Sequence, residues 1–237
     1  MTSDLHRNPF LLIGATTRDN RQRIVELAES KALELDPDIC QRARTELTNP
    51  RARLKAEVGW LPGVAPRKAQ QLILALNTDP LSVGDEINLP TLAVLNLFCA
   101  AIEAKGGLNS LQQVSTAIEK VVRLVEDLDA NQVLRDINED RSVSGIPQVS
   151  NLDVVESELS DRSRYFRNVL KSALDQLTPE HLVSAITSVV QKLTAGGSNH
   201  PPRLLDDIVD SYALEARDFL QKEAANIDRL IAAARPA

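Results

Sequence analysis

Apolar residues recur at steps of three and four along most of this chain, and no other feature restricts its fold as strongly. The clearest run has spacings of 3, 4, 3, 4 and 3 and consists of Leu111, Val114, Ile118, Val121, Val125 and Leu128. Such spacing is typical of antiparallel bundles and short coiled coils. The same periodicity over residues 20–35, 165–177 and 182–193 predicts further amphipathic helices. We therefore expect an all-α protein.

Composition agrees with a helical fold. Apolar residues make up 43% of the 237 residues but aromatic residues only 3%, with 9 Gly and 12 Pro. A β-sandwich would require more aromatic residues in its strands and more Gly in its turns. Two cysteines, Cys40 and Cys99, cannot form a disulfide framework and suit a reducing compartment, so we expect a cytoplasmic protein. The richest apolar stretch, residues 92–102, is far short of the ~20 residues that span a membrane.

Several helix starts are marked by a capping residue. Asp36-Pro37, Asn49-Pro50 and Thr178-Pro179 each place a side-chain acceptor before a proline that suits the first helical turn. Asp129, followed three residues later by a glutamine, indicates another start. Residues 91–105 are apolar nearly all round, so this helix is expected at the centre of the core, and Gly106-Gly107 is predicted to end it.

The chain divides into three parts. We predict a first helical module over residues 1–62, a central helical segment over residues 63–140, and C-terminal helices over residues 151–237 that pack with the central segment as one bundle. Residues 141–150 contain Ser, Gly and Pro and are predicted to be a linker. The last pattern, residues 202–235, predicts a single helix of roughly 50 Å.

Motifs of enzyme chemistry are missing from the sequence. It has no phosphate-binding GxxxxGK(S/T) loop, no GxGxxG fingerprint and no nucleophile elbow. His6, His181 and His200 are scattered and have no Cys or carboxylate at metal-ligand spacing. We therefore expect no catalytic residue, no metal site and no cofactor, and we predict that the protein is not an enzyme.

Charge is divided unevenly along the chain. Residues 1–72 hold 12 Lys and Arg against 9 Asp and Glu, whereas the remaining residues hold 15 against 24. The basic residues that could form a patch are Arg42, Arg44, Arg51, Arg53 and Lys55. Such a patch could meet an acidic partner or nucleic acid. The alternative is a solvated helical face, and the lack of interleaved aromatic residues makes nucleic acid the less expected partner.

The first sixty residues contain four short segments whose order and spacing are those of a known family. They are Asn8–Gly14 (NPFLLIG), Ile24–Asp38 ending in Asp-Pro-Asp, Cys40–Pro50 ending in ELTNP, and Arg51–Arg53. Over residues 8 to about 60, a quarter of the chain, the sequence resembles a J domain. The segments correspond to the opening turn of that family, helix II with its His-Pro-Asp loop, helix III, and the start of helix IV.

The resemblance implies a helical module that docks on a heat-shock ATPase chaperone and stimulates its ATP hydrolysis through His-Pro-Asp. Here an aspartate stands at the histidine position, and a carboxylate only accepts hydrogen bonds where an imidazole can donate. The helix II face, basic in the family, mixes arginines with Glu26, Glu29 and Glu34. The partner-binding residues that the resemblance implies are Arg21, Arg23, Lys31, Asp36, Pro37 and Asp38. The alternative role of Asp36 is that of a helix cap alone.

These observations predict a non-catalytic adaptor or co-chaperone-like protein that acts through protein–protein contacts, with a J-like module unable to stimulate a chaperone ATPase. Its partner would be a chaperone, a client or an enzyme subunit encoded nearby, and the long helices would allow a homo-oligomer. Two alternatives stay open. One is an active J-domain co-chaperone that tolerates Asp36, and the other is a nucleic-acid-associated subunit that uses the N-terminal basic residues.

Overall fold

The all-α prediction is confirmed by the computed structural model, which describes residues 3–78, 80, 88–104, 108 and 110–234. Within these ranges the chain forms eleven α-helices and a short 3₁₀ helix, and no strand. In chain order they are η1 (Asp4–Arg7), α1 (Pro9–Ile13), α2 (Arg21–Lys31), α3 (Pro37–Thr48), α4 (Pro50–Val58), α5 (Pro66–Thr78), α6 (Thr91–Ala104), α7 (Leu111–Glu126), α8 (Ala130–Ser144), α9 (Leu152–Leu174), α10 (Pro179–Leu193) and α11 (Arg203–Ala234). Gly106-Gly107 lies outside the described residues.

The predicted capping residues begin four of these helices. Asp36 Oδ1 accepts a hydrogen bond from the Asp38 backbone N–H at 2.9 Å, and Asn49 Oδ1 accepts from the first turn of α4. Asp129 and Thr178 cap α8 and α10 in the same way. These starts are therefore confirmed, whereas α2 ends at Lys31, four residues earlier than its periodicity indicates.

Helix α6 lies at the centre of the core, as its sequence predicts. One side of it belongs to the larger of two hydrophobic clusters through Leu92, Leu95, Phe98, Cys99 and Ile102. The opposite side belongs to the smaller cluster through Ala93, Leu97, Ala100 and Ala101. The smaller cluster includes residues of α1 to α5, and the larger one includes residues of α7 to α11. Each cluster therefore needs α6 to complete it.

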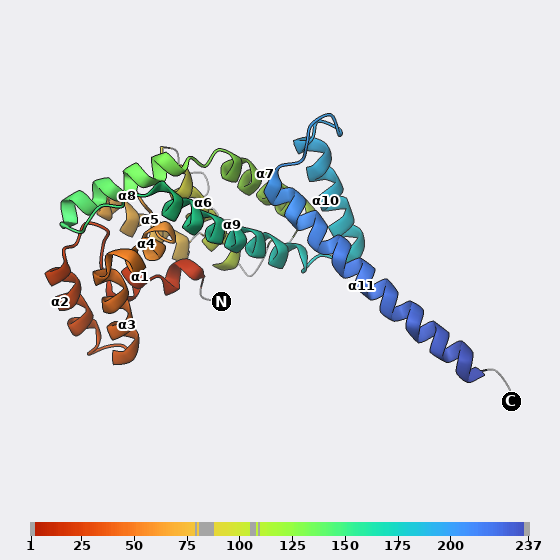
Figure 1. Ribbon diagram of the computed structural model, residues 1–237, viewed down its shortest axis with the longest axis horizontal. Helices are drawn as coiled ribbons and strands as arrows, with labels where there is room; N and C mark the ends of the chain where they lie inside the picture. Colours follow the sequence, from red (N-terminus) through yellow and green to blue (C-terminus); the bar gives the residue numbers. More distant parts are fainter. Residues whose placement is uncertain (1–2, 79, 81–87, 105–107, 109, 235–237) are drawn as a thin grey trace.

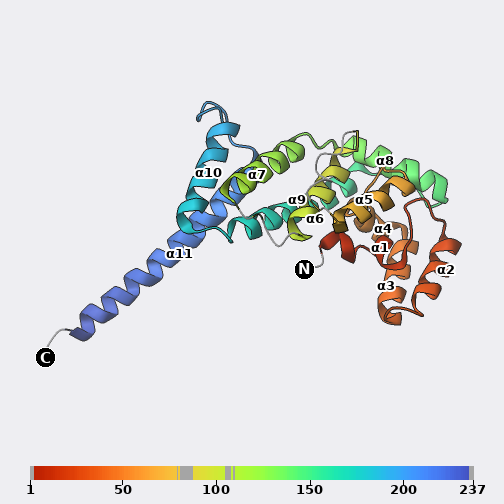
Figure 2. The same cartoon turned by 180° about the vertical axis from the view of Figure 1, so that it is seen from behind.

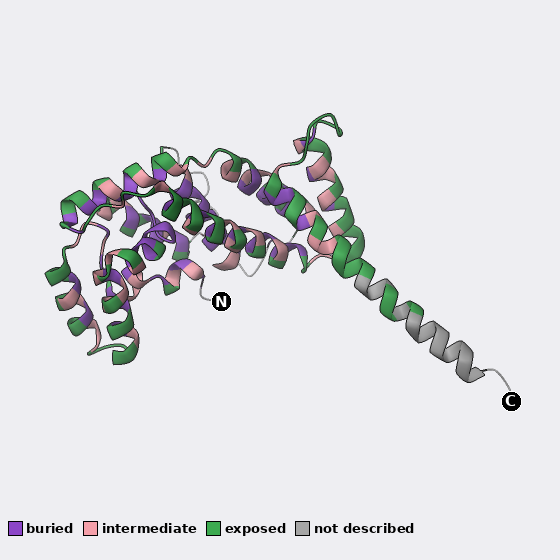
Figure 3. Ribbon diagram, viewed as in Figure 1, coloured by how far each residue is buried: buried purple, intermediate pink, exposed green. Residues whose placement is uncertain are grey.

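The apolar stripe on α7 faces the larger cluster. Val114, Ile118 and Val121 are buried there, while Leu111 and Val125 pack against its edge. Helices α6, α9 and α10 lie against α7, and the ribbon segments that face one another are those coloured as buried (Figure 3). The periodicity of the sequence therefore identifies the packed face of α7 correctly.

Helices α2 and α3 form an antiparallel hairpin at one end of the molecule, and α11 extends from the opposite end (Figures 1 and 2). Helix α1 packs against α3 at the base of this hairpin. The start of α11 is anchored by Leu204, Leu205 and Ile208, which are buried in the larger cluster. None of the helices in the described part of the chain is long and apolar enough to cross a membrane.

Residues 141–150 are not a linker, and that prediction is wrong. Helix α8 continues through Arg141 and Ser144, each 2% exposed, and ends at Gly145 with a left-handed backbone (φ 68°). The Asn138 side chain then holds the following segment, because it donates to the carbonyl of Val149 and accepts from its N–H. Small and polar residues are typical of linkers, which is why the sequence predicts one here. The helical turn and the two hydrogen bonds to Asn138 hold this segment instead.

Candidate functional site

The free end of the α2–α3 hairpin carries the tripeptide that the J-domain resemblance singles out. Asp36, Pro37 and Asp38 are all exposed there, and the Asp36 carboxylate caps α3. Two leucines precede the tripeptide in the turn: Leu33 is 89% exposed and Leu35 is 40% exposed. This end of the molecule therefore offers apolar side chains beside carboxylates.

Two of the three basic residues of α2 are paired with acids of the same hairpin. Arg23 lies 3.3 Å from Glu26, and the Lys31 ammonium lies 2.5 Å from the Glu34 carboxylate. Because exposed pairs of this kind contribute at most about 1 kcal/mol each, they do little for stability. Their effect is to place a negative charge beside two of the positive charges on this helix.

The other predicted basic residues are at least partly accessible and line different depressions. Arg42 and Lys55 line one groove, whereas Arg44 lines a second hollow together with Arg21. Arg51 is exposed on α4 and lines neither of them. Whether these side chains act as one patch stays a prediction.

Arg53 is buried, and its assignment to a surface patch is wrong. Its side chain is 0% exposed, and its Nε donates to Glu57 Oε1 at 2.7 Å. Arg141 from α8 donates to the same carboxylate, with Nη2 lying 2.7 Å from Oε2. Three buried charges thus form an Arg–Glu–Arg triad that ties α4 to α8.

The triad satisfies the rest of its hydrogen-bonding groups on the backbone. Arg53 and Arg141 donate to four carbonyl oxygens, those of Thr17 at 2.6 Å, Leu47 at 3.3 Å, Pro50 at 2.9 Å and Pro147 at 2.8 Å. Thr17 and Pro147 lie in loops and Leu47 lies in the last turn of α3, where carbonyls lack helical partners, whereas Pro50 is the first residue of α4. The two guanidinium groups therefore act as a structural support and not as a ligand site.

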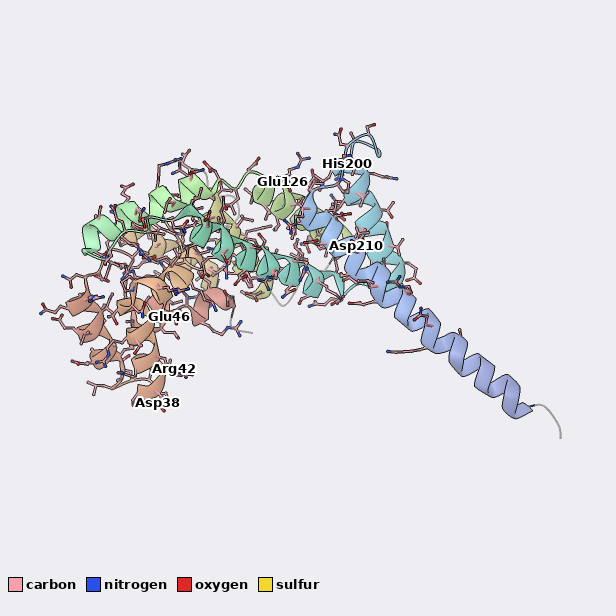
Figure 4. The ribbon with its side chains drawn as sticks, in the orientation of Figure 1. Asp38, Arg42, Glu46, Glu126, His200 and Asp210 are labelled. Carbon is pink, nitrogen blue, oxygen red and sulfur yellow. The ribbon has the colours of Figure 1, made fainter. Side chains whose placement is uncertain are left out.

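A groove of about 740 Å³ lies between α1, α3, α4 and α9. Charged side chains of both signs line it: Arg7, Arg42, Lys55, Arg162, Asp4, Glu46, Glu158 and Asp161. On the α3 side, Arg42 and Glu46, four residues apart along that helix, line the groove (Figure 4). Partial burial raises the pKa of Glu46 above its ordinary value, and the nearby Lys55 opposes this effect.

Arg162 of α9 lines the same groove but is only 8% exposed. Its Nε donates to Asn96 Oδ1 at 2.8 Å, and its Nη1 donates to Asp4 Oδ2 at 2.5 Å. The guanidinium also lies over the Tyr165 ring, 3.9 Å from the ring centroid. Its Nη2 finds no acceptor among the residues that the structure describes. One buried donor at this groove is therefore left without a partner.

A second, apolar hollow of about 330 Å³ lies between α1 and α5. Phe10, Trp60 and Ile73 form much of its wall, and Leu74, 66% exposed, stands at the same site. Its size suits one apolar side chain or a small apolar molecule.

Nucleophiles and metal ligands are not assembled in the described part of the chain. Cys40 and Cys99 are both buried, and burial raises the pKa of Cys99 to about 12. A thiol with that pKa stays protonated at neutral pH and is a poor nucleophile. No group of three or more His, Cys, Asp or Glu side chains in these ranges could hold a metal ion.

Sequence reasoning missed Glu57, Arg141, Asn96 and Arg162. Two of them left a signal. Glu57 follows Arg53 by four residues, the spacing of an ion pair on one helix face. Asn96 interrupts the apolar helix α6, and its amide donates to the carbonyls of Val58 and Trp60. Arg141 and Arg162 resemble any other charged residue on an amphipathic helix, so nothing in the sequence marks them.

No protein-family model matches this chain, and neither a curated protein nor a solved structure matches it. The J-domain resemblance therefore rests on the sequence segments of residues 8–60 alone.

Proposed function

We propose that the protein is a non-catalytic adaptor that acts through protein–protein contacts, with a J-like module at its N-terminus and a long helix at its C-terminus. The observation that carries the proposal is the free end of the α2–α3 hairpin. Leu33, 89% exposed, and Leu35 stand there beside Asp36-Pro37-Asp38. An apolar centre with a polar rim is the arrangement found at protein–protein interfaces.

Two features favour an adaptor over a stimulator of chaperone ATPase activity. The Asp36 carboxylate accepts a hydrogen bond from the backbone of α3, so it caps a helix and has no proton to donate. Arg23 and Lys31, on the helix that corresponds to the docking helix of the J-domain family, are paired with glutamates one turn away. A negative charge thereby stands beside two of the three positive charges on this helix.

Helix α11 supplies a second contact region in this proposal. Its apolar pattern continues in the sequence through Phe219, Leu220, Ile227 and Leu230, whose side chains lie outside the described residues. Leu214, nearer the body, is 51% exposed. A partner helix, from a second copy or from another protein, would cover this stripe.

The partner is expected to be a chaperone, a client or an enzyme subunit, and the compartment is expected to be the cytoplasm. A nucleic-acid role has less support, because Arg53 is buried and Arg42 and Arg44 line different depressions. An active co-chaperone that tolerates Asp36 is the remaining alternative.

The first experiment measures steady-state ATP turnover of a heat-shock ATPase chaperone with and without the protein. We expect no stimulation by the natural sequence. If the protein stimulates ATP turnover and Asp36→Asn abolishes that stimulation, the adaptor proposal is wrong and the active co-chaperone is supported.

The second experiment tests the hairpin end as the contact surface. The natural protein and a Leu33→Ser, Leu35→Ser variant are used as baits in native lysate, with Val183→Ser, an apolar residue of α10 that is 62% exposed, as the control. We expect one partner, identified by mass spectrometry, to be lost with the hairpin variant and retained with the control. A strictly monomeric protein that retains no stable partner would contradict the proposal.

A further inference from the structure

We propose that the groove between α1, α3, α4 and α9 binds a carboxylate carried by a peptide segment of a protein partner, and that Arg162 is the group that recognises it. The residues that line this groove do not include Leu33, Leu35 or Asp36-Pro37-Asp38, so the inference does not depend on the function proposed for the hairpin end.

The first argument is the unpaired donor. Arg162 is more than nine-tenths buried, and its Nη2 has no acceptor within the described residues. A buried N–H in this state has lost its hydrogen bonds to water and gained nothing in exchange, which is rare in folded proteins. A ligand that brings an acceptor restores that hydrogen bond, and an ionised acceptor forms the strongest one.

The second argument is that the guanidinium is already held in place. Asn96 accepts from its Nε at 2.8 Å, Asp4 accepts from its Nη1 at 2.5 Å, and the Tyr165 ring lies against its face. Three contacts on three elements fix the orientation before any ligand arrives. Binding therefore loses little side-chain freedom at this position.

The groove's own carboxylates do not satisfy Nη2. Asp4 is engaged with Nη1, and Asp161, which also lines the groove, pairs with Arg164 of the same helix. Glu46 and Glu158 also line the groove, but neither accepts a hydrogen bond from Nη2. Nη2 thus has no acceptor within the described part of the chain, and a ligand can supply one.

Charge balance selects the kind of anion. The groove has four basic and four acidic side chains, so its formal charge is zero. A polyanion such as nucleic acid would meet four carboxylates, whereas one carboxylate adds a single charge next to Arg162. The walls contain Pro9, Leu12 and Ile39, which suit an apolar side chain next to that carboxylate. A peptide with an acidic residue or a free C-terminus between apolar residues fits both conditions.

The Nη2 group is shielded from solvent in the free protein. The carboxylate therefore reaches it when a neighbouring side chain rotates. Arg42 is exposed, lines the groove and has a long stem, so it can move aside without disturbing the core.

Three five-residue peptides serve as probes in an NMR titration that follows the Arg162 Nε–Hε signal. Acetyl-ALELA-amide carries a side-chain carboxylate, acetyl-ALQLA with a free C-terminus carries a terminal one, and acetyl-ALQLA-amide carries none. We expect saturable shifts with at least one of the two carboxylate peptides and none with the neutral peptide. The tighter of the two identifies the source of the carboxylate.

Matched variants locate the site. Arg162→Lys should weaken binding about tenfold or more, because a hydrogen bond to a charged group is lost. Lys55→Ala should weaken it about two- to fivefold, as for an exposed charge. Arg51→Ala, one turn earlier on α4 and outside the groove, should leave binding unchanged. The last two substitutions are on the surface, so they remain informative even if Arg162→Lys fails to fold.

The inference is overturned by any of three results: equal binding of the neutral peptide, no binding of either carboxylate peptide, or an equal effect of Arg51→Ala and Lys55→Ala. Preferential binding of inorganic phosphate or of an oligonucleotide would also contradict it.

Discussion

Replacing Glu57 by Gln should destabilise this protein far more than any surface substitution. The Glu57 carboxylate is 2% exposed and lies between Arg53, 0% exposed, and Arg141, 2% exposed. It accepts four hydrogen bonds from the two guanidinium groups, at 2.7 to 3.2 Å. Glutamine keeps the shape but removes the negative charge, so two buried cations face each other and an amide N–H₂ points at their donors.

The size of the effect follows from the burial of the triad. Breaking a buried ion pair by neutralising one member costs about 3–5 kcal/mol, since the remaining charge has neither water nor a counter-ion. Domains are typically stable by about 5–15 kcal/mol, so this loss is a large fraction of the total. With a urea m-value of about 3 kcal/mol/M, the midpoint should fall by more than about 1 M.

Urea unfolding followed by far-UV circular dichroism measures this loss. Arg23→Ala, which removes an exposed pair with Glu26, is the control and should change stability by less than about 1 kcal/mol. Combining Glu57→Gln with Arg141→Met should cost less than the two single losses together, because the second change removes one of the stranded cations. If Glu57→Gln costs no more than the control, the triad does not stabilise the fold and the reasoning is refuted.

Three further outcomes are expected. Asp36→Ala should cost about 1 kcal/mol in the same urea assay through loss of the α3 cap, and an unchanged midpoint would exclude that role. Burial raises the pKa of Asp136, so ionisation of its carboxyl opposes folding as the pH rises. Asp136→Asn should therefore raise the melting temperature at pH 7, with a smaller gain near pH 4, and a constant gain would contradict this assignment. Cys40 and Cys99 should resist alkylation at pH 8 until urea is added, since both are buried and the pKa of Cys99 is raised to about 12.

The parts of the fold that depend only on residues close to one another in the sequence were predictable. The caps at Asp36 and Asn49 need only a side chain and the backbone two or three residues further on. The stripe on α7 needs only the helical repeat. The end of α8 was not predictable, because Arg141 is buried by a carboxylate 84 residues away in the chain.

The same distinction between contacts local in sequence and contacts distant in sequence applies to the candidate site. Its exposed tripeptide Asp36-Pro37-Asp38 follows from turn and cap signals. The groove does not, since Arg162 meets Asn96 and Asp4 only when three distant segments have packed. Counting charges also treats Arg51 and Arg53 alike, although one is in solvent and the other is fully enclosed.

The position of α6 has a consequence for how this chain can be divided or recombined. Ala93, Leu97, Ala100 and Ala101 are fully enclosed by the N-terminal helices, while the opposite side of the same helix supports α7 and α9. A fragment that begins after α5 would expose these four apolar residues of α6 to solvent. A fragment that ends before α6 would lose the helix that covers the smaller hydrophobic cluster. The N-terminal helices are thus not a transferable cassette. Gene fusions or truncations that separate the N-terminal helices from α6 should yield insoluble protein. Substitutions in either hydrophobic cluster must remain compatible with the packing of α6, because both clusters contain it.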